Sequence, residues 1–116
     1  MSEAKDFYFA AGASIETPPV PVELRRNAGY ILRQVQEGKD PDPTKCSNFK
    51  AYSTVGSGCY QISLDKTWRI IYWVGPKAIY VLNVFPKKRN NTPKQAIETC
   101  KTRLVAVKKH HRCNYE

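Results

Sequence analysis

The sequence predicts a small α+β fold, in which an antiparallel sheet packs against one helix that precedes it and one that follows it. Three observations predict this class. Three strand-like runs with short connections fill the middle of the chain, an amphipathic helical pattern comes before them, and a helix with a clear start signal comes after them. The chain has 116 residues. That length suits a single domain over residues 1–116 and excludes a large multidomain enzyme.

The first expected element is a short N-terminal edge strand. Residues 7–9 are all aromatic and therefore β-prone, and this run ends at residues 10–12. The prolines at 18, 19 and 21 then disfavour regular structure and prepare a helix start, since proline is tolerated in a first helical turn. We interpret residues 1–20 as this strand followed by a proline-rich loop.

An amphipathic helix is expected from Val22 to about Glu37. Its apolar residues follow helical spacing, and they are Leu24, Ala28, Ile31, Leu32 and Val35. Gly38 ends the helix, and the prolines within residues 39–43 predict a loop. Residues 45–58 show no clean period, which indicates a further loop with at most a short helical turn.

A three-stranded meander is expected next, at residues 59–64, 67–74 and 78–85. The connections are only two and three residues long, which makes neighbouring strands antiparallel. In the middle strand, Arg69 and Ile71 should face one side of the sheet and Ile70 the other. Both faces of this sheet are therefore expected to be at least partly covered.

The C-terminal helix has a strong start signal. Thr92 can cap the helix, Pro93 suits its first position and Gln95 completes a capping box. The packing stripe recurs at three- and four-residue steps and consists of Ile97, Cys100, Leu104 and Val107. Residues 110–116 carry no structural signal and are expected to form a flexible tail.

The apolar pattern also limits where the protein can reside. The longest apolar run, residues 70–74, is far short of the ~20 residues of a membrane-spanning helix, so no membrane partner is expected. Residues 1–6 mix both signs of charge and match no secretory signal. A cytoplasmic location is the resulting expectation.

The chain has four cysteines, at positions 46, 59, 100 and 113. Three disulfide pairings are open in principle, but we interpret the cysteines as thiols because the expected compartment is reducing. The alternative is a zinc site built from Cys100, His110, His111 and Cys113. Their spacing matches no known zinc motif, so no metal is expected.

Positive charge is concentrated in the second half of the chain. Residues 1–58 carry seven basic and seven acidic side chains, whereas residues 59–116 carry twelve basic and three acidic ones, so the whole net charge of +9 lies in the second half. A solvated basic surface is one interpretation. An imbalance this local more often marks a surface that binds a polyanion, and we favour nucleic acid. Acidic partner proteins stay open.

The strongest candidate site is Arg69 together with the basic run of Lys87, Lys88 and Arg89 after the third strand of the meander. An arginine inside an apolar strand is costly unless it is paired or faces a polar groove, and few carboxylates are near it in sequence. A structural ion pair is the alternative. The aromatic residues of the strands could stack on bases, although core packing is their commoner role. A catalytic role for the terminal histidines is a weaker hypothesis.

Several short motifs follow one another in an order that is more specific than any single motif. They are Gly29-Tyr30-Ile31-Leu32, Gln36-x-Gly38-Lys39-x-Pro41, Gly56-x-Gly58-Cys59-Tyr60-Gln61-Ile62, Trp68-Arg69-Ile70-Ile71-Tyr72, a run from Ile79 to Lys88, and Thr92-Pro93-Lys94. Over roughly residues 7–104 this series resembles the HigB-like, phage-derived branch of the RelE/ParE toxin superfamily of type II toxin–antitoxin systems.

The resemblance implies a RelE-like fold and an endoribonuclease that cuts mRNA on the translating ribosome without a metal or another cofactor. It also implies a cognate helix-turn-helix antitoxin as partner. By motif matching, the catalytic residues would be Arg69, Lys87 and Lys88, with Lys45 matching the lysine that precedes a glycine-containing loop. Together with Lys45, the neighbouring cations Lys50, Arg89 and Lys94 would contact the RNA.

Two departures from the family pattern leave a second class of function open. Related sequences usually have a histidine followed by an aromatic-x-Lys-Lys run, and this chain has Asn83 and Pro86 there. Gln61 stands where a glutamate is common. Because an amide cannot transfer protons as imidazole does, the alternative is a catalytically impaired RNA- or protein-binding module. A ParE-like gyrase inhibitor is a further alternative.

Overall fold

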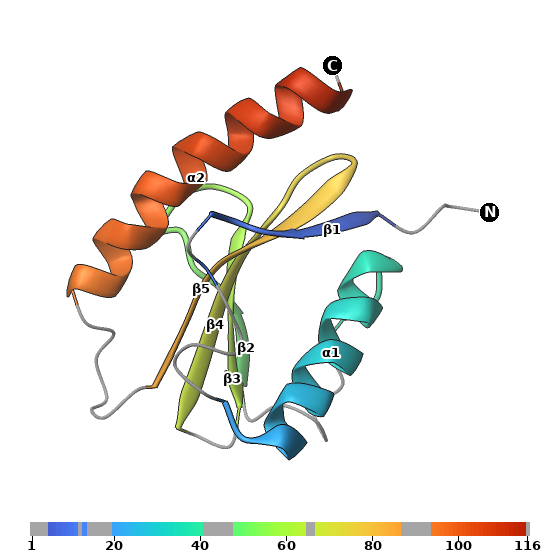
Figure 1. Ribbon diagram of the computed structural model, residues 1–116, viewed down its shortest axis with the longest axis vertical. Coiled ribbons are helices and arrows are strands. Elements are labelled where there is room, and N and C mark those ends of the chain that lie inside the picture. Colours follow the sequence, from blue (N-terminus) through green and yellow to red (C-terminus); the bar gives the residue numbers. More distant parts are fainter. Residues whose placement is uncertain are drawn as a thin grey trace.

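The computed structural model describes residues 5–11, 13, 20–40, 48–64, 67–86 and 94–115. The elements, in chain order, are β1 (Asp6–Phe9), α1 (Val22–Gln36), β2 (Asn48–Ala51), β3 (Cys59–Leu64), β4 (Trp68–Val74), β5 (Ala78–Pro86) and α2 (Lys94–Tyr115). The strands form one sheet in the order β1-β5-β4-β3-β2, and the two helices lie on opposite faces of it (Figure 1). The predicted α+β class is confirmed, but the sheet has five strands and is mixed rather than antiparallel, because β1 pairs in parallel with β5.

The predicted meander is present as β3, β4 and β5, each within one residue of the expected bounds. Both of its pairings are antiparallel. The alternation of β4 is also as predicted, because Ile70 packs in the core on the α1 side and Ile71 in the core on the α2 side. This short-loop unit provides the rigid centre on which Arg69 is placed.

The predicted edge strand is present as β1, and it pairs in parallel with the first half of β5. Its register sets Asp6 opposite Ala78 and Phe9 opposite Val81. The backbone N–H of Ala10 continues the ladder by donating to the carbonyl oxygen of Val81 at 2.9 Å. The order of the strands therefore leaves β1 at one edge of the sheet and β2 at the other.

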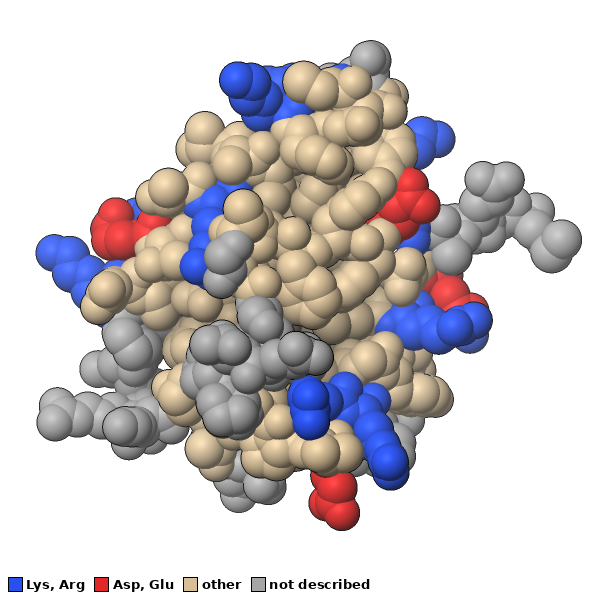
Figure 2. All heavy atoms as spheres, viewed as in Figure 1, with Lys and Arg blue, Asp and Glu red and all other residues tan. Residues whose placement is uncertain are grey.

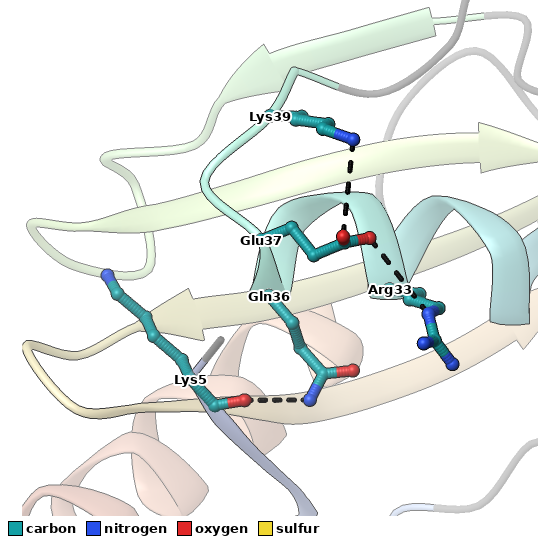
Figure 3. A network of polar contacts seen from close by, with 5 residues as sticks. All are labelled: Lys5, Arg33, Gln36, Glu37 and Lys39. Carbon is teal, nitrogen blue, oxygen red and sulfur yellow. Dashed lines mark hydrogen bonds and ion pairs between the residues drawn. The ribbon is translucent and has the colours of Figure 1, made fainter. Parts of the chain in front are cut away.

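Helix α1 agrees with its predicted bounds and is tied to the start of β1. The backbone N–H of Lys5 donates to the carbonyl oxygen of Gln36 at 2.9 Å, and the side-chain amide of Gln36 returns a 2.7 Å bond to the carbonyl of Lys5 (Figure 3). One carboxylate oxygen of Glu37 lies 3.9 Å from Nε of Arg33, and the other lies 4.0 Å from Nζ of Lys39. Both ion pairs are exposed and contribute little stability. Gly38 follows with a φ of 80°, which supports the predicted helix end.

The expectation of a loop over residues 45–58 is wrong for residues 48–51, which form β2. This strand pairs antiparallel with β3, and the ring of Phe49 stacks on that of Tyr60 with centroids 5.5 Å apart. Four residues are too few to show a period of two in the sequence. The strand exists because a neighbouring strand offers hydrogen bonds and an aromatic surface, which are tertiary features.

The expected flexible tail over 110–116 also differs from the structure, in which α2 continues through Tyr115. His111 is buried, and its Nε2 accepts a 3.2 Å hydrogen bond from the backbone N–H of Lys77. The hydroxyl of Tyr115 donates to the carboxylate of Asp6 and lies 2.9 Å from the hydroxyl of Tyr8. These contacts join the last turns of α2 to the loop before β5 and to β1.

Two hydrophobic cores lie on the two faces of the sheet. The core on the α1 side joins residues such as Ala28, Ile31 and Leu32 to Ile62, Ile70, Ile79 and Val81. The core on the α2 side joins Cys100, Leu104 and Val107 to Cys59, Ile71, Tyr80, Leu82 and Phe85. Within the described ranges, no helix has the length and apolar content needed to cross a membrane.

Candidate phosphate-binding site on the α2 side of the sheet

Arg69 lies near the start of β4, between Ser63 of β3 and Phe85 of β5. Strand alternation places its side chain on the same face as Ile71, which is the α2 side. The side chain is half-buried, and its Nε atom is buried with no hydrogen-bond partner among the described residues. Burial lowers the pKa of Arg69 below its usual range. The guanidinium nevertheless keeps its charge, because arginine is not deprotonated in proteins.

The alternative reading of Arg69, a structural ion pair, has no support in the part of the chain that the structure describes. The ion pairs found there join Glu37 to Arg33 and to Lys39, at the end of α1. A partly desolvated guanidinium with an unused donor is unfavourable. An anion that accepts hydrogen bonds from it, such as a phosphate, would remove that cost.

A β-bulge on β5 shapes the surface beside Arg69. Ile71 pairs with Asn83 and Tyr72 with Val81, so Leu82 is an extra residue in β5. As a result, Leu82 and Asn83 both face the α2 side, Leu82 within the core there. The bulge thus exposes a backbone carbonyl and an amide side chain toward α2.

Arg103 of α2 fills this position. Its Nη1 donates a 2.7 Å hydrogen bond to the carbonyl oxygen of Leu82 and lies 3.4 Å from Oδ1 of Asn83. Asn83 is opposite Ile71 and Arg69 is opposite Phe85, so Arg69 and Asn83 are diagonal neighbours on the face of the sheet that Arg103 contacts. Sequence analysis did not select Arg103. The available signal was its place three residues after Cys100, at the border of the packing stripe.

Asn83 is held from α2 by a second residue, Cys100. Burial raises the pKa of Cys100 to about 12, and a hydrogen bond between its thiol and the side chain of Asn83 opposes this rise only weakly. The thiol therefore stays protonated near neutral pH. Asn83 itself cannot act as an acid or base.

The remaining predicted residues divide into two groups. Lys50 of β2 is opposite Gln61 of β3, which in turn is opposite Ile71 of β4. Lys50 is therefore on the face of the sheet that Ile71 and Arg69 share, and it is exposed. Lys94 is exposed at the first residue of α2, on a different element. The other candidates lie outside the described residues, and they are Lys45, Lys87, Lys88 and Arg89. We call Lys50, Arg69, Asn83 and Arg103 the Arg69 face.

The histidines are not part of the Arg69 face. Nδ1 of His110 lies 3.0 Å from the hydroxyl of Tyr80, and His111 is bonded to the backbone of Lys77. Both contacts are at the start of β5, whereas Arg69 is opposite Phe85 near its end. In the described portion of the chain, no three His, Cys, Asp or Glu side chains are grouped so that they could hold a metal ion.

Of the four cysteines, Cys59 and Cys100 are buried free thiols and Cys113 is an exposed free thiol, which agrees with their interpretation as thiols. Burial raises the pKa of Cys59 from 9.0 to about 11. Cys46 lies outside the described residues. Neither buried thiol has the depressed pKa that a reactive cysteine requires.

Comparison with known proteins identifies the family of this chain. No curated protein matches it. A family model described as "Phage derived protein Gp49-like (DUF891)" matches residues 19–105, a range that contains Arg69, Asn83 and Arg103. This family is associated with the toxins of toxin–antitoxin systems. Because the match spans well over half of the sequence, the chain belongs to the phage-derived Gp49-like family.

Proposed function

We propose that this protein is the toxin of a type II toxin–antitoxin system, of the HigB-like branch, and that it cuts mRNA on the translating ribosome. Membership of the Gp49-like family supports the toxin role. The observation that carries the RNA part is Arg69, whose half-buried guanidinium has an unused donor on a strand at the centre of the sheet. A rigid strand holds such a group in a fixed direction, which suits the recognition of phosphate.

The proposed reaction needs orientation and charge more than special side-chain chemistry. The ribose 2′-oxygen attacks the neighbouring phosphorus and the bond from phosphorus to the 5′-oxygen breaks. Negative charge develops on the phosphate oxygens during this step. Arg69 stabilises that charge together with Lys87, and preorganised donors of this kind have large effects on rate. Arg103 adds a second positive group to the same face.

Proton transfer is assigned to a lysine. The 2′-hydroxyl must lose a proton and the leaving 5′-oxygen must gain one. Neighbouring cations lower the pKa of an amine, because the neutral form is favoured beside like charge. Lys88 and Lys45 are the candidates for this role. Lys50, Arg89 and Lys94 would bind flanking phosphates, which fixes the register of the message without reading its bases.

A second candidate function is RNA binding without cleavage. Asn83 favours it, because its amide is hydrogen-bonded to Arg103 and cannot act as a general acid or base. In this reading, the Arg69 face still binds phosphate, but the message stays intact. The two candidates share a surface and differ only in the chemical step.

The deciding experiment is primer extension on a message bound to translating ribosomes, with and without the purified protein. New 5′ ends that require ribosomes would support the proposed nuclease. Binding to the message without new ends would instead establish the binding module. Intact message combined with double-strand breaks in gyrase-treated DNA would establish the third class, a gyrase inhibitor, and overturn both RNA proposals.

A further inference from the structure

The outer edge of β1 is an unpaired strand edge in the described part of the chain, separate from the Arg69 face. β1 ends the sheet, and no other strand of the described residues pairs with its outer side. The backbone N–H of Asp6 donates to the carbonyl oxygen of Lys77, just before β5, and that of Ala10 donates to Val81 of β5. Because backbone groups alternate along a strand, those of Phe7 and Phe9 point outward. An edge of this kind is a template for another strand.

The outward-pointing N–H of Lys5, the residue before β1, already has a hydrogen-bond partner. The N–H of Lys5 donates to the carbonyl oxygen of Gln36 at 2.9 Å, which closes this edge at its N-terminal end. Two residues therefore offer their backbone groups, Phe7 and Phe9. Phe9 is 41% exposed and its neighbour Tyr8 is 36% exposed, which is high for large hydrophobic residues.

A cleft lies on each side of this edge. The cleft on the α1 side has a volume of about 270 Å³ and is lined by Phe7, Phe9, Arg25, Gly29, Leu32 and Gln36. The cleft on the α2 side has a volume of about 190 Å³, and its lining includes Tyr8, Phe9, Tyr80, Val107 and His110. Phe9 lines both clefts, so they meet at β1. An added strand would direct alternate side chains into them.

The charge on this surface indicates the chemistry of the occupant. Figure 2 shows this side of the molecule, where uncharged atoms dominate the centre and most charged atoms lie toward the margins. Arg25 lines the α1-side cleft, and its Nε atom is buried and has no hydrogen-bond partner among the described residues. A carboxylate from the occupant would satisfy it. The occupant should therefore combine apolar side chains with an acidic one.

We propose that the outer edge of β1 and its two clefts bind an extended apolar segment of a partner protein as a sixth strand, with an acidic side chain of that segment bound to Arg25. A second copy of this chain fits less well, because each copy carries a net charge of +9 and association would bring like charges together. That the partner is the antitoxin rests on the proposed function. The proposed binding of a strand at this edge does not depend on the mRNA-cutting function, because β1 pairs only with the half of β5 that is remote from Arg69.

The test measures peptide binding by fluorescence polarisation, without ribosomes or RNA. The probe is a labelled peptide of about eight residues, near the usual length of a strand, with apolar residues on both faces and a single central glutamate. Comparison peptides replace the glutamate with lysine, or carry N-methyl groups on alternate backbone amides. The proposal expects saturable binding of the first peptide and clearly weaker binding of both others.

Phe9→Lys and Tyr30→Lys form a matched pair of variants. Both replace an aromatic residue that is about half exposed, 41% and 49% respectively, but Tyr30 lines neither cleft. Phe9→Lys should weaken binding about tenfold or more, as expected for a central contact residue, whereas Tyr30→Lys should leave it unchanged. Arg25→Gln should remove the preference for glutamate over lysine. Circular dichroism checks that each variant is folded.

Hydrogen exchange adds a readout that does not depend on any variant. The backbone amides of Phe7 and Phe9 should become protected when the peptide binds. Equal loss of binding in Phe9→Lys and Tyr30→Lys, or no protection of these amides, would overturn the proposal. So would a dimer of the free protein that Phe9→Lys dissociates and Tyr30→Lys does not, since a second copy would then occupy the edge. None of these results would alter the mRNA-cutting proposal.

Discussion

Arg103 of α2 donates a 2.7 Å hydrogen bond from Nη1 to the carbonyl oxygen of Leu82, at the bulge of β5. This bond joins the second helix to the centre of the sheet at the position where the ladder between β4 and β5 is interrupted. It also orients Asn83, whose Oδ1 lies 3.4 Å from the same nitrogen. The guanidinium group of Arg103 therefore contacts both Leu82 and Asn83 at the bulge and joins them to α2.

Arg103→Ala should therefore destabilise the protein. The change leaves a partly buried carbonyl without its charged donor, which typically costs about 1–3 kcal/mol. Arg112→Ala is the matched control, because Arg112 is an exposed arginine on the same helix. Urea denaturation followed by tryptophan fluorescence measures both. Equal free energies of unfolding for the two variants would contradict the role assigned to Arg103.

Removal of residues 110–116 should also destabilise the fold, in contrast to the flexible tail that the sequence suggested. The truncation deletes buried His111 and leaves the N–H of Lys77 without its acceptor. It also removes Tyr115 from Asp6 and Tyr8. The melting temperature should fall by several degrees, as about 1–2 kcal/mol does in a domain of this size. An unchanged melting temperature would show that these turns contribute nothing.

The contrast between predicted and observed elements has a physical basis. β3, β4, β5 and α1 were predicted with nearly correct bounds, because local hydrophobic period and turn residues determine them. β2 and the last turns of α2 were missed because distant partners stabilise them, such as β3 for Phe49 and Lys77 for His111. Local pattern carries no information on such partners.

The same distinction applies to the candidate site. Arg69 was identified from sequence because a charged residue inside an apolar strand is locally conspicuous. Arg103 was not, because it lies on a helix that carries four lysines and its importance depends on the bulge at Leu82. The bulge arises from the pairing of β4 with β5 and has no signal in either strand alone.

Thiol reactivity should separate the cysteines. Burial raises the pKa of Cys59 to about 11 and that of Cys100 to about 12, so both stay protonated and inaccessible at pH 8. Exposed Cys113 should react with iodoacetamide before Cys59 and Cys100. Mass spectrometry of the digested protein measures alkylation at each position. Alkylation of Cys100 as fast as that of Cys113 in the folded protein would be incompatible with its burial.

The same shifts predict a pH dependence of stability. A raised thiol pKa favours the neutral form in the folded state, whereas the unfolded thiol ionises near pH 9. Stability from this source is therefore fully present below pH 9 and is lost as the pH rises from 9 toward 11 and 12. The double variant Cys59→Ala, Cys100→Ala should lose less stability across this range than the wild type. A parallel decline in both proteins would assign the loss to other groups.

RNA binding should fall steeply with salt, because the proposed contacts are to phosphates. Lys50 is exposed on the same face as Arg69. Lys50→Ala should reduce the slope of log affinity against log salt by about one and weaken all sequences alike. Lys39→Ala is the control for the loss of one lysine charge, because Lys39 follows α1, where it pairs with Glu37, and is not part of the Arg69 face. A flat salt dependence of the wild type would exclude phosphate contacts as the main source of affinity.

The prediction that tests the function most directly concerns Arg69. Arg69→Lys keeps the charge but loses the planar fork that can bind two phosphate oxygens, whereas Arg69→Ala loses both. Ribosome-dependent cutting should therefore decrease in the order Arg, Lys, Ala, and removal of one transition-state donor typically lowers the rate by ~100-fold or more. The free energy of unfolding should not decrease along with the cutting rate in Arg69→Ala. The reason is that Nε of Arg69 has no hydrogen-bond partner among the described residues and that burial of the charge is unfavourable.

That separation of activity from stability distinguishes a catalytic from a structural arginine. Arg26→Ala is the matched control, because Arg26 is exposed on α1, on the opposite side of the sheet, and it should retain full cutting. Primer extension measures activity and urea denaturation measures stability on the same preparations. If Arg69→Ala cuts as fast as the wild type, Arg69 does not bind the reacting phosphate. If it loses activity only in proportion to its folded fraction, the guanidinium supports the sheet and the catalytic assignment fails.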